Sequence, residues 1–188
     1  MDFSMKMHGF TLPETLIVLI IAALIFSFAV PWSRDLLKSL EAQRVTTELY
    51  SLVLKARSEA ALQRTAINLC GSSDARSCDG KWDVGIIMFR DNNHNNLIDS
   101  AEDLISYAPL NITPSRISWR GFGGSQVTFE QTGASYASNG TFTYCREEKD
   151  PRYSRQIILN RGGRARTSRD DDKDGKHEGS NGLPIACP

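Results

Sequence analysis

Near the start of this 188-residue chain lies the segment Gly9-Phe10-Thr11-Leu12-Pro13-Glu14-Thr15-Leu16-Ile17-Val18-Leu19-Ile20-Ile21. It opens an apolar run that continues to Val30 and carries one ionisable residue, Glu14. At about 1.5 Å per residue, a helix over residues 10–30 is roughly 30 Å long, which is the thickness of the hydrocarbon core of a bilayer. We therefore expect a membrane-spanning helix at the start of the chain.

The small residue next to the apolar run, Gly9, precedes the run instead of following it. A secretory signal peptide places its small cleavage-site residues after the apolar segment. Here Gly9 precedes the segment, so cleavage after Gly9 leaves the segment on the mature chain as an anchor. An acid inside such a segment is costly and indicates a function; the plain alternative is that Glu14 is solvated at the level of the lipid headgroups.

Helical character continues beyond Pro31, where the wholly apolar run ends. Apolar residues recur at three- and four-residue steps, and neither glycine nor proline interrupts residues 32–63. The apolar positions are Leu36, Leu37, Leu40, Val45, Leu49, Leu52, Val53, Ala56, Ala60 and Ala61. We expect one helix from about residue 11 to Gln63, with this stripe packed on the following domain.

After Gln63 the pattern changes to short stretches of β-branched and aromatic residues between glycine- and asparagine-rich turns. Seven stretches are expected as strands: residues 65–69, 82–90, 104–108, 117–120, 127–130, 141–144 and 155–160. A long helix followed by short strands predicts an α+β fold with a small two-sheet antiparallel β domain. The expected divisions are a leader at 1–9, a transmembrane helix at 10–31, an amphipathic helix at 32–63 and a β domain at 64–188.

Four cysteines lie only in the second part of the chain: Cys70, Cys78, Cys145 and Cys187. An even number after a membrane segment indicates disulfides in an oxidising compartment. Sequence alone leaves three pairings open; pairing by neighbourhood joins Cys70 with Cys78 and Cys145 with Cys187. They lack the spacing of a zinc site or a C-x-x-C motif, so a metal or redox role is not expected.

Residues 91–102 imitate a calcium loop. Oxygen-bearing side chains fall at loop places 1, 3, 5, 9 and 12, namely Asp91, Asn93, Asn95, Asp99 and Glu102. Place 6, which favours glycine, is Asn96. The alternative that we favour is an asparagine-rich connection that hydrogen-bonds its own backbone, and we expect neither a metal nor another cofactor.

Residues Gly9 to Glu14 resemble the class III signal of type IV prepilins and type II secretion pseudopilins. The resemblance implies cleavage between Gly9 and Phe10 by a prepilin peptidase, methylation of the new Phe10 amine, and a role for Glu14 in assembly. Pro13 departs from the usual isoleucine, but proline is tolerated in the first turn of a helix. Residues 55–70 and 82–102 look like the corresponding regions of FimT/FimU and GspH minor pilins, which implies the type IV pilin fold.

Arginines are concentrated near the C-terminus. Between residues 152 and 169 there are six and no acid: Arg152, Arg155, Arg161, Arg164, Arg166 and Arg169. Side chains at Arg164 and Arg166 would project from one side of an extended strand, and guanidinium groups suit phosphate oxygens. An exposed glycine backbone at Gly163 would let a phosphate approach.

The segment Gly163-Arg164-Ala165-Arg166 looks like the Gly-Arg-x-Arg motif of FimT-type pilins. The resemblance implies binding of extracellular DNA for natural transformation, with Arg164 and Arg166 as contacts. We expect Arg161 and Arg169 to assist electrostatically. Because aromatic residues do not separate the arginines, double-stranded DNA is favoured over single-stranded DNA.

The acids that follow oppose this interpretation. Asp170, Asp171, Asp172 and Asp174 would pair with the arginines or repel phosphate. Alternatively, residues 170–179, which lack large hydrophobic side chains, form a mobile tail that moves aside or masks the site.

We expect a minor type IV pilin that is anchored in the inner membrane before assembly and then joins other major and minor pilins in an extracellular pilus. One alternative is a structural minor pilin that primes assembly at the tip without binding DNA. The other is a GspH-like pseudopilin of a type II secretion system. An enzyme is not expected, because neither an activated nucleophile nor a catalytic carboxylate pair is placed by a motif.

Overall fold

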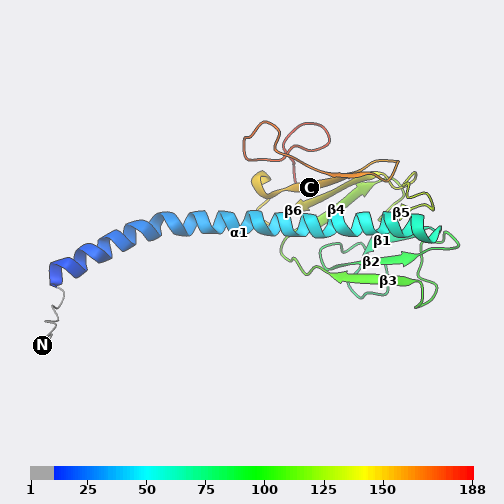
Figure 1. The fold of residues 1–188 in the computed structure, drawn as a ribbon, viewed down its shortest axis with the longest axis horizontal. Helices are drawn as coiled ribbons and strands as arrows, with labels where there is room; N and C mark the ends of the chain where they lie inside the picture. The colour runs from blue at the N-terminus through cyan, green and yellow to red at the C-terminus, as the bar shows by residue number, and fades with distance from the viewer. Residues whose placement is uncertain (1–10) are drawn as a thin grey trace, which may run out of the picture. The chain divides into compact units, whose positions relative to one another are not determined.

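The computed structural model describes residues 11–188, so the expected cleavage and methylation site at Gly9 and Phe10 lies outside the described residues. Helix α1 (Leu12–Gln63) is continuous over 52 residues. Eight strands and one short 3-10 helix follow it (Figure 1). The chain divides into two compact units, Met1–Lys38 and Ser39–Pro188.

Thr11 and Glu14 define the start of α1. The backbone N–H groups of Glu14 and Thr15 each donate to the Thr11 carbonyl at 3.1 Å. The Thr11 N–H donates back to Glu14 Oε2 at 3.5 Å, at the long end of hydrogen-bond range. The bond from Thr11 to Glu14 is one half of a capping box, and it satisfies an N–H group that the first helical turn leaves without a partner.

The first part of α1 is long and apolar enough to cross a membrane, by length and composition. Its large side chains are exposed; Leu16, Ile20 and Leu24 are each more than half accessible. A helix that is apolar on all sides is unsuited to water and suited to hydrocarbon. This segment therefore fits a membrane anchor.

The second part of α1 buries one stripe in the unit Ser39–Pro188. The buried residues are Ala42, Val45, Leu49, Val53, Ala56 and Ala60, each 0–2% exposed. Their three- and four-residue steps bring them to one helix face, which packs on side chains of both sheets. The expectation that Leu36, Leu37, Leu40 and Ala61 belong to this core is wrong, because all four are exposed.

Two four-stranded antiparallel sheets form the rest of the unit. The first has the order β3 (Leu104–Pro109), β2 (Gly85–Arg90), β1 (Ile67–Gly71), β5 (Gln126–Phe129). The second has the order β4 (Arg116–Gly121), β6 (Gly140–Cys145), β7 (Arg155–Leu159), β8 (Ala165–Thr167). Figure 1 shows the second half of α1 running beside both sheets. The α+β fold with two antiparallel sheets is confirmed, and β8 is an additional strand that the sequence pattern did not indicate.

Two disulfides tie down polar segments of this unit. Cys70–Cys78 closes the loop after β1, and Cys145–Cys187 links the end of β6 to the C-terminal residues. These are the pairs that neighbourhood in the chain suggested. The 3-10 helix η1 (Pro151–Tyr153) lies between β6 and β7, with the Asp150 side chain accepting from the Arg152 N–H at its start.

Candidate nucleic-acid interface

Strands β7 and β8 form a hairpin that carries the basic motif. They pair antiparallel, with Ile158 opposite Arg166 and Leu159 opposite Ala165. Asn160 closes the turn: its carbonyl accepts from the Gly163 N–H at 3.0 Å, and its side-chain Oδ1 accepts from the Arg164 N–H at 3.0 Å. This side-chain bond to the backbone is the usual way in which asparagine stabilises a turn.

Gly163 lets the turn between β7 and β8 pack closely on the Gly133 backbone. Its φ of +72° is in the left-handed region, and a Cβ there would lie 1.9 Å from the Gly133 carbonyl oxygen. The Arg161 carbonyl accepts from the Ser135 N–H at 3.0 Å in the same region. Gly163 is buried, so the expectation that its backbone is open to a phosphate is wrong. This glycine positions the turn.

Arg164 and Arg166 point away from the core. Both are exposed, whereas the alternate residues Ala165 and Thr167 are partly buried. The Tyr50 hydroxyl on α1 donates to the Ala165 carbonyl at 3.4 Å, which holds the inner side of β8. This alternation places both guanidinium groups on one side of an edge strand, as the one-residue spacing predicted.

The structure divides the six arginines into two groups. Arg152 pairs with Asp150 at 2.7 Å. Arg155 is half-buried and donates to the carbonyls of Arg152 and Ser154 at 2.8 Å; burial lowers the pKa of its guanidinium below the ordinary value. The other four, Arg161, Arg164, Arg166 and Arg169, are exposed. Within residues 11–188 their guanidinium groups form neither ion pairs nor hydrogen bonds.

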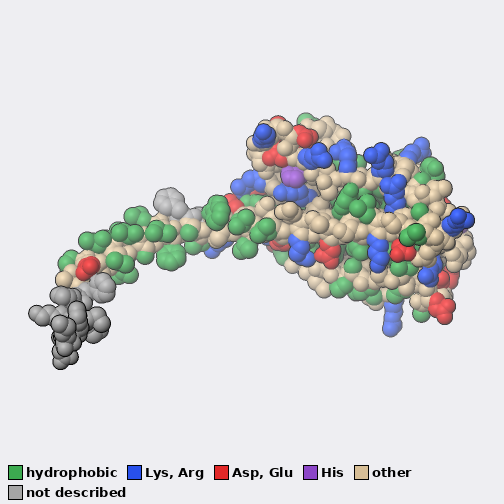
Figure 2. Space-filling view, in the orientation of Figure 1, with side chains coloured by type: hydrophobic (Ala, Val, Ile, Leu, Met, Phe, Trp, Pro, Cys, Tyr) green, Lys and Arg blue, Asp and Glu red, His purple; other side chains and the backbone are tan. Residues whose placement is uncertain are grey.

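The acids after β8 lie beside part of this basic group. Arg166 and Arg169 line a shallow depression together with Asp171, Asp172 and Glu178. Figure 2 shows blue side chains along the upper edge of the unit and red ones gathered over the loop at its upper left. Arg161 and Arg164, on the turn, do not line that depression. The acids therefore oppose phosphate binding at the β8 end more than at the turn.

The structure disagrees with the alternative in which residues 170–179 form a mobile tail. Glu178 forms β-bridges with Arg169 and with Pro184. The Glu178 N–H donates to the Arg169 carbonyl at 2.8 Å. A segment without large hydrophobic side chains is thus held by backbone pairing and by the disulfide that follows it.

The asparagine-rich loop, residues 91–102, forms hydrogen bonds within itself, as a connection between two strands does. Asp91 is buried, and its oxygens accept from the backbone N–H groups of Asn95 and Asn96 at 3.0 Å. The amides of Asn93 and Asn95 donate to the two oxygens of Asp99 at 2.8 and 2.9 Å. The chain itself thus supplies donors to both aspartates, and Glu102 is exposed.

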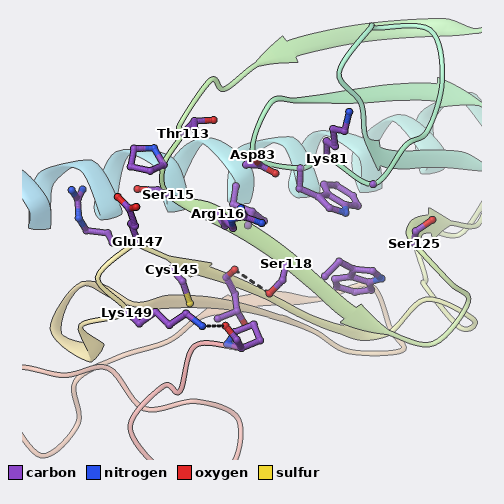
Figure 3. Close-up of a pocket in the computed structure, with 18 residues that line it drawn as sticks. Lys81, Asp83, Thr113, Ser115, Arg116, Ser118, Ser125, Cys145, Glu147 and Lys149 are labelled. Atoms are coloured by element: carbon purple, nitrogen blue, oxygen red, sulfur yellow. Dashed lines mark hydrogen bonds between the residues drawn. The ribbon is translucent and has the colours of Figure 1, made fainter.

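A larger groove of about 870 Å³ lies on the unit Ser39–Pro188 (Figure 3). Its wall combines both charge signs, for example Lys81 and Arg116 with Asp83 and Glu147. Lys149 donates to the Pro188 oxygen at 2.6 Å within it. The groove therefore lacks the uniform positive charge that the β7–β8 hairpin offers.

One long N-terminal helix followed by two antiparallel sheets defines the pilin-like class of proteins. Within that class, the family model described as type II transport protein GspH matches residues 45–163, and the chain belongs to this family. Membership and fold make it a subunit of the minor pilin and pseudopilin class. The matched range ends at Gly163, so Arg164, Arg166 and the acidic loop lie beyond it.

Among solved structures, the chain is similar to the type IV minor pilin FimU of Pseudomonas aeruginosa PAO1 in two crystal forms. The first has 20% identity and a TM-score of 0.56 over 79% of this chain and 96% of that one. The second has 20% identity and a TM-score of 0.53 over 78% and 99%. The minor pseudopilin EpsH of the Vibrio cholerae type 2 secretion system has 12% identity and a TM-score of 0.49 over 68% and 95%. The FimU likeness supports the fold, and no curated protein matches the chain.

Proposed function

We propose that this protein is a minor pilin that binds the phosphate backbone of double-stranded DNA through Arg164 and Arg166. The observation that carries the proposal is the exposed pair of guanidinium groups on one side of the edge strand β8. Held by the Asn160 turn and by the contact between Gly163 and Gly133, they are positioned without ion pairs to other described residues. Such groups bind phosphate without first giving up an internal partner.

The expected binding is electrostatic. Contacts to phosphate release counterions, so affinity falls with salt and carries no sequence preference. Arg161 lies on the same turn and adds to the positive potential. Asp171 and Glu178 reduce the positive potential at both Arg166 and Arg169, so the potential is expected to be highest at the turn that carries Arg161 and Arg164. Uptake of extracellular DNA in natural transformation is the proposed use of this binding.

The N-terminal segment supplies the second half of the proposal. A prepilin peptidase cleaves between Gly9 and Phe10, and the Phe10 amine is methylated. The helix anchors the subunit in the inner membrane, with the unit Ser39–Pro188 outside the cytoplasm, until it packs among other pilins in an extracellular pilus. In the filament Glu14 meets the N-terminal amine of a neighbour, because an uncompensated charge among apolar helices is costly. The capping bond to the Thr11 N–H uses only Oε2 of this carboxylate.

A second candidate is a purely structural subunit of a type IV pilus or a type II secretion pseudopilus. Two observations favour it: the GspH match ends before Arg164, and acids lie beside Arg166 and Arg169. In that case the subunit contacts other pilins only, and the arginines are solvated surface charge. Neither candidate involves catalysis.

Binding of a fluorescently labelled duplex by the full chain in detergent micelles distinguishes the candidates. We expect the Arg164→Gln/Arg166→Gln variant to lose at least about tenfold in affinity at low salt, because two phosphate contacts are removed. The matched control is Arg116→Gln/Arg120→Gln, which removes two exposed arginines from β4, the opposite edge strand of the same sheet. The control should change affinity less than about twofold. Absence of wild-type binding, or equal losses in both variants, would favour the structural subunit.

A further inference from the structure

The loop that follows β8 has the spacing of a cation-binding loop. Asp170, Asp172 and Asp174 alternate and are followed directly by Gly175. These are places 1, 3, 5 and 6 of the calcium loop of EF-hand proteins, where three side chains bring oxygen and a glycine makes the sharp turn. Glu178 stands at place 9, which supplies a ligand in such loops.

The structure brings these side chains together. Asp170, Asp172, Asp174 and Glu178 each offer a carboxylate oxygen, and these oxygens all lie within 4.8 Å of one another. Gly175 has a φ of +86°, the conformation that the glycine at place 6 supplies. Four carboxylates at this separation repel one another, and a cation among them would offset that repulsion.

A separate observation concerns two of the oxygens. Asp170 Oδ1 and Glu178 Oε1 are shielded from solvent and have no hydrogen-bond donor among the described residues. The other oxygen of each carboxylate is used by the loop backbone: the Gly175 N–H donates to Asp170 Oδ2 at 3.1 Å, and the Asp171 N–H donates to Glu178 Oε2 at 2.7 Å. An acceptor oxygen that is shielded from water and lacks a donor is unfavourable, and more so when it is charged. These two oxygens are therefore open to a cation, although Asp170 and Glu178 are only partly buried and the Arg155 guanidinium interacts electrostatically with Asp170.

We propose that the loop Asp170–Glu178 binds a calcium ion through these four carboxylates. The donor set consists of oxygen atoms, which suits calcium and disfavours softer metals. The nearby His177 is engaged elsewhere, because its Nδ1 lies 3.2 Å from Ser168 Oγ and 3.0 Å from the Ser168 carbonyl oxygen. Place 12, a glutamate in EF-hand loops, is Asn181 here, so the carboxylate of Glu178 takes over the role of the last acid.

Cationic side chains of the chain itself compete with an added ion: Arg155 interacts electrostatically with Asp170, and Lys176 bonds Asp174. Lys176 Nζ donates to Asp174 Oδ2 at 2.8 Å, and this hydrogen bond lowers the pKa of the Asp174 carboxyl below its ordinary value. Both side chains are more than a third accessible, and exposed ion pairs of this kind contribute little stability. Displacing Lys176 into solvent therefore costs little compared with what a divalent ion gains.

Calcium binding by the loop Asp170–Glu178 would affect DNA binding by the β7–β8 hairpin, but it does not require that the hairpin binds DNA. A bound divalent cation offsets two of the negative charges beside Arg166 and Arg169. If the hairpin binds DNA, calcium should strengthen that binding. If it does not, calcium binding to the loop is unaffected, so the two proposals can fail separately.

Calorimetric titration of calcium into the chelator-treated full chain in detergent micelles tests the proposal. We expect one ion per chain and a rise in the unfolding temperature with calcium concentration, because the ion binds the folded loop. The Asp170→Asn/Asp172→Asn variant should lower the affinity at least about tenfold, because ligand charge sets the affinity of such loops.

The matched control is Asp171→Asn, which removes one charge from the same loop but no oxygen from the cluster. It should lower the affinity less than about threefold. If the double variant is misfolded by circular dichroism, Glu178→Gln replaces it with the same expectation. Absence of both heat and a shift in unfolding temperature up to about 10 mM calcium would overturn the proposal, since that exceeds the range of extracellular calcium modules. Unchanged binding by a folded ligand variant would overturn it equally.

Discussion

At the residue scale, Gly163 shows why the basic motif begins with glycine. Alanine at this position would place a Cβ 1.9 Å from the Gly133 carbonyl oxygen and would hold a non-glycine residue at a φ of +72°. We expect Gly163→Ala to lower the free energy of unfolding by about 1–3 kcal/mol, as strained backbone positions do. Gly162→Ala is the control, because its Cβ would meet only Asn160 Oδ1 at 3.4 Å. Urea unfolding that gave equal losses for both variants would contradict this role of Gly163.

The one-residue spacing of Arg164 and Arg166 predicts that both lie on one side of a strand. The role of Gly163 could not be predicted from the sequence. Spacing within a strand is a local property, and the sequence displays it directly. The contact that buries Gly163 comes from Gly133, thirty residues earlier in the chain, and no local pattern reveals it. The acidic cluster was recognised only as an electrostatic opponent of DNA, although the alternation from Asp170 to Gly175 was visible in the sequence.

At the scale of elements, α1 is joined to the second sheet through Glu41. Ser115 Oγ and the Tyr144 hydroxyl donate to Glu41 Oε1 at 2.9 and 3.0 Å, and Arg146 pairs with Oε2. Partial burial raises the pKa of Glu41, but these hydrogen bonds and the positive charge of Arg146 outweigh it and bring the pKa below the ordinary 4.5. The negatively charged form of Glu41 thus stabilises the contact between helix and sheet.

This arrangement predicts a pH-dependent effect of Glu41→Gln. Because the folded-state pKa is lowered, the stabilisation is complete above the ordinary pKa and is lost as the pH falls through the lowered value. At pH 7 the variant should be less stable by about 1–2 kcal/mol, allowing for partial exposure. The difference from wild type should shrink as urea unfolding is repeated from pH 5 down to pH 3. A difference that is constant over this range would exclude the ionised carboxylate as its cause.

The elements themselves were predictable to different degrees. The continuous apolar and then amphipathic pattern predicted α1 to within one residue at its start, and at its end Gln63 was correct. Seven strands were indicated by short stretches of β-branched and aromatic residues between turn signals. Strand β8 was not, because its three residues, Ala165, Arg166 and Thr167, lie at a sheet edge and contain no large apolar side chain. Leu36, Leu37 and Leu40 continue the apolar stripe in the sequence, but their side chains are exposed.

At the scale of the whole molecule, the two disulfides should differ in their contribution to stability. The Cys145–Cys187 bond closes a separation of 42 residues and the Cys70–Cys78 bond one of 8. In the chain-entropy model these loops correspond to about 4 and about 2.6 kcal/mol. We therefore expect Cys145→Ser/Cys187→Ser to destabilise the protein more than Cys70→Ser/Cys78→Ser in urea unfolding. The reverse order would show that the loop after β1 contributes through contacts rather than chain entropy.

The salt dependence of DNA affinity tests whether Arg164 and Arg166 bind DNA phosphates. With the full chain in detergent micelles, the logarithm of affinity should fall linearly with the logarithm of salt concentration, with a slope between about −2 and −4 for two to four arginine contacts. The Arg164→Gln/Arg166→Gln variant should reduce the slope by about 2, whereas Arg116→Gln/Arg120→Gln should leave it unchanged. A wild-type protein that does not bind, or a slope that the hairpin variant leaves unchanged, would contradict the account.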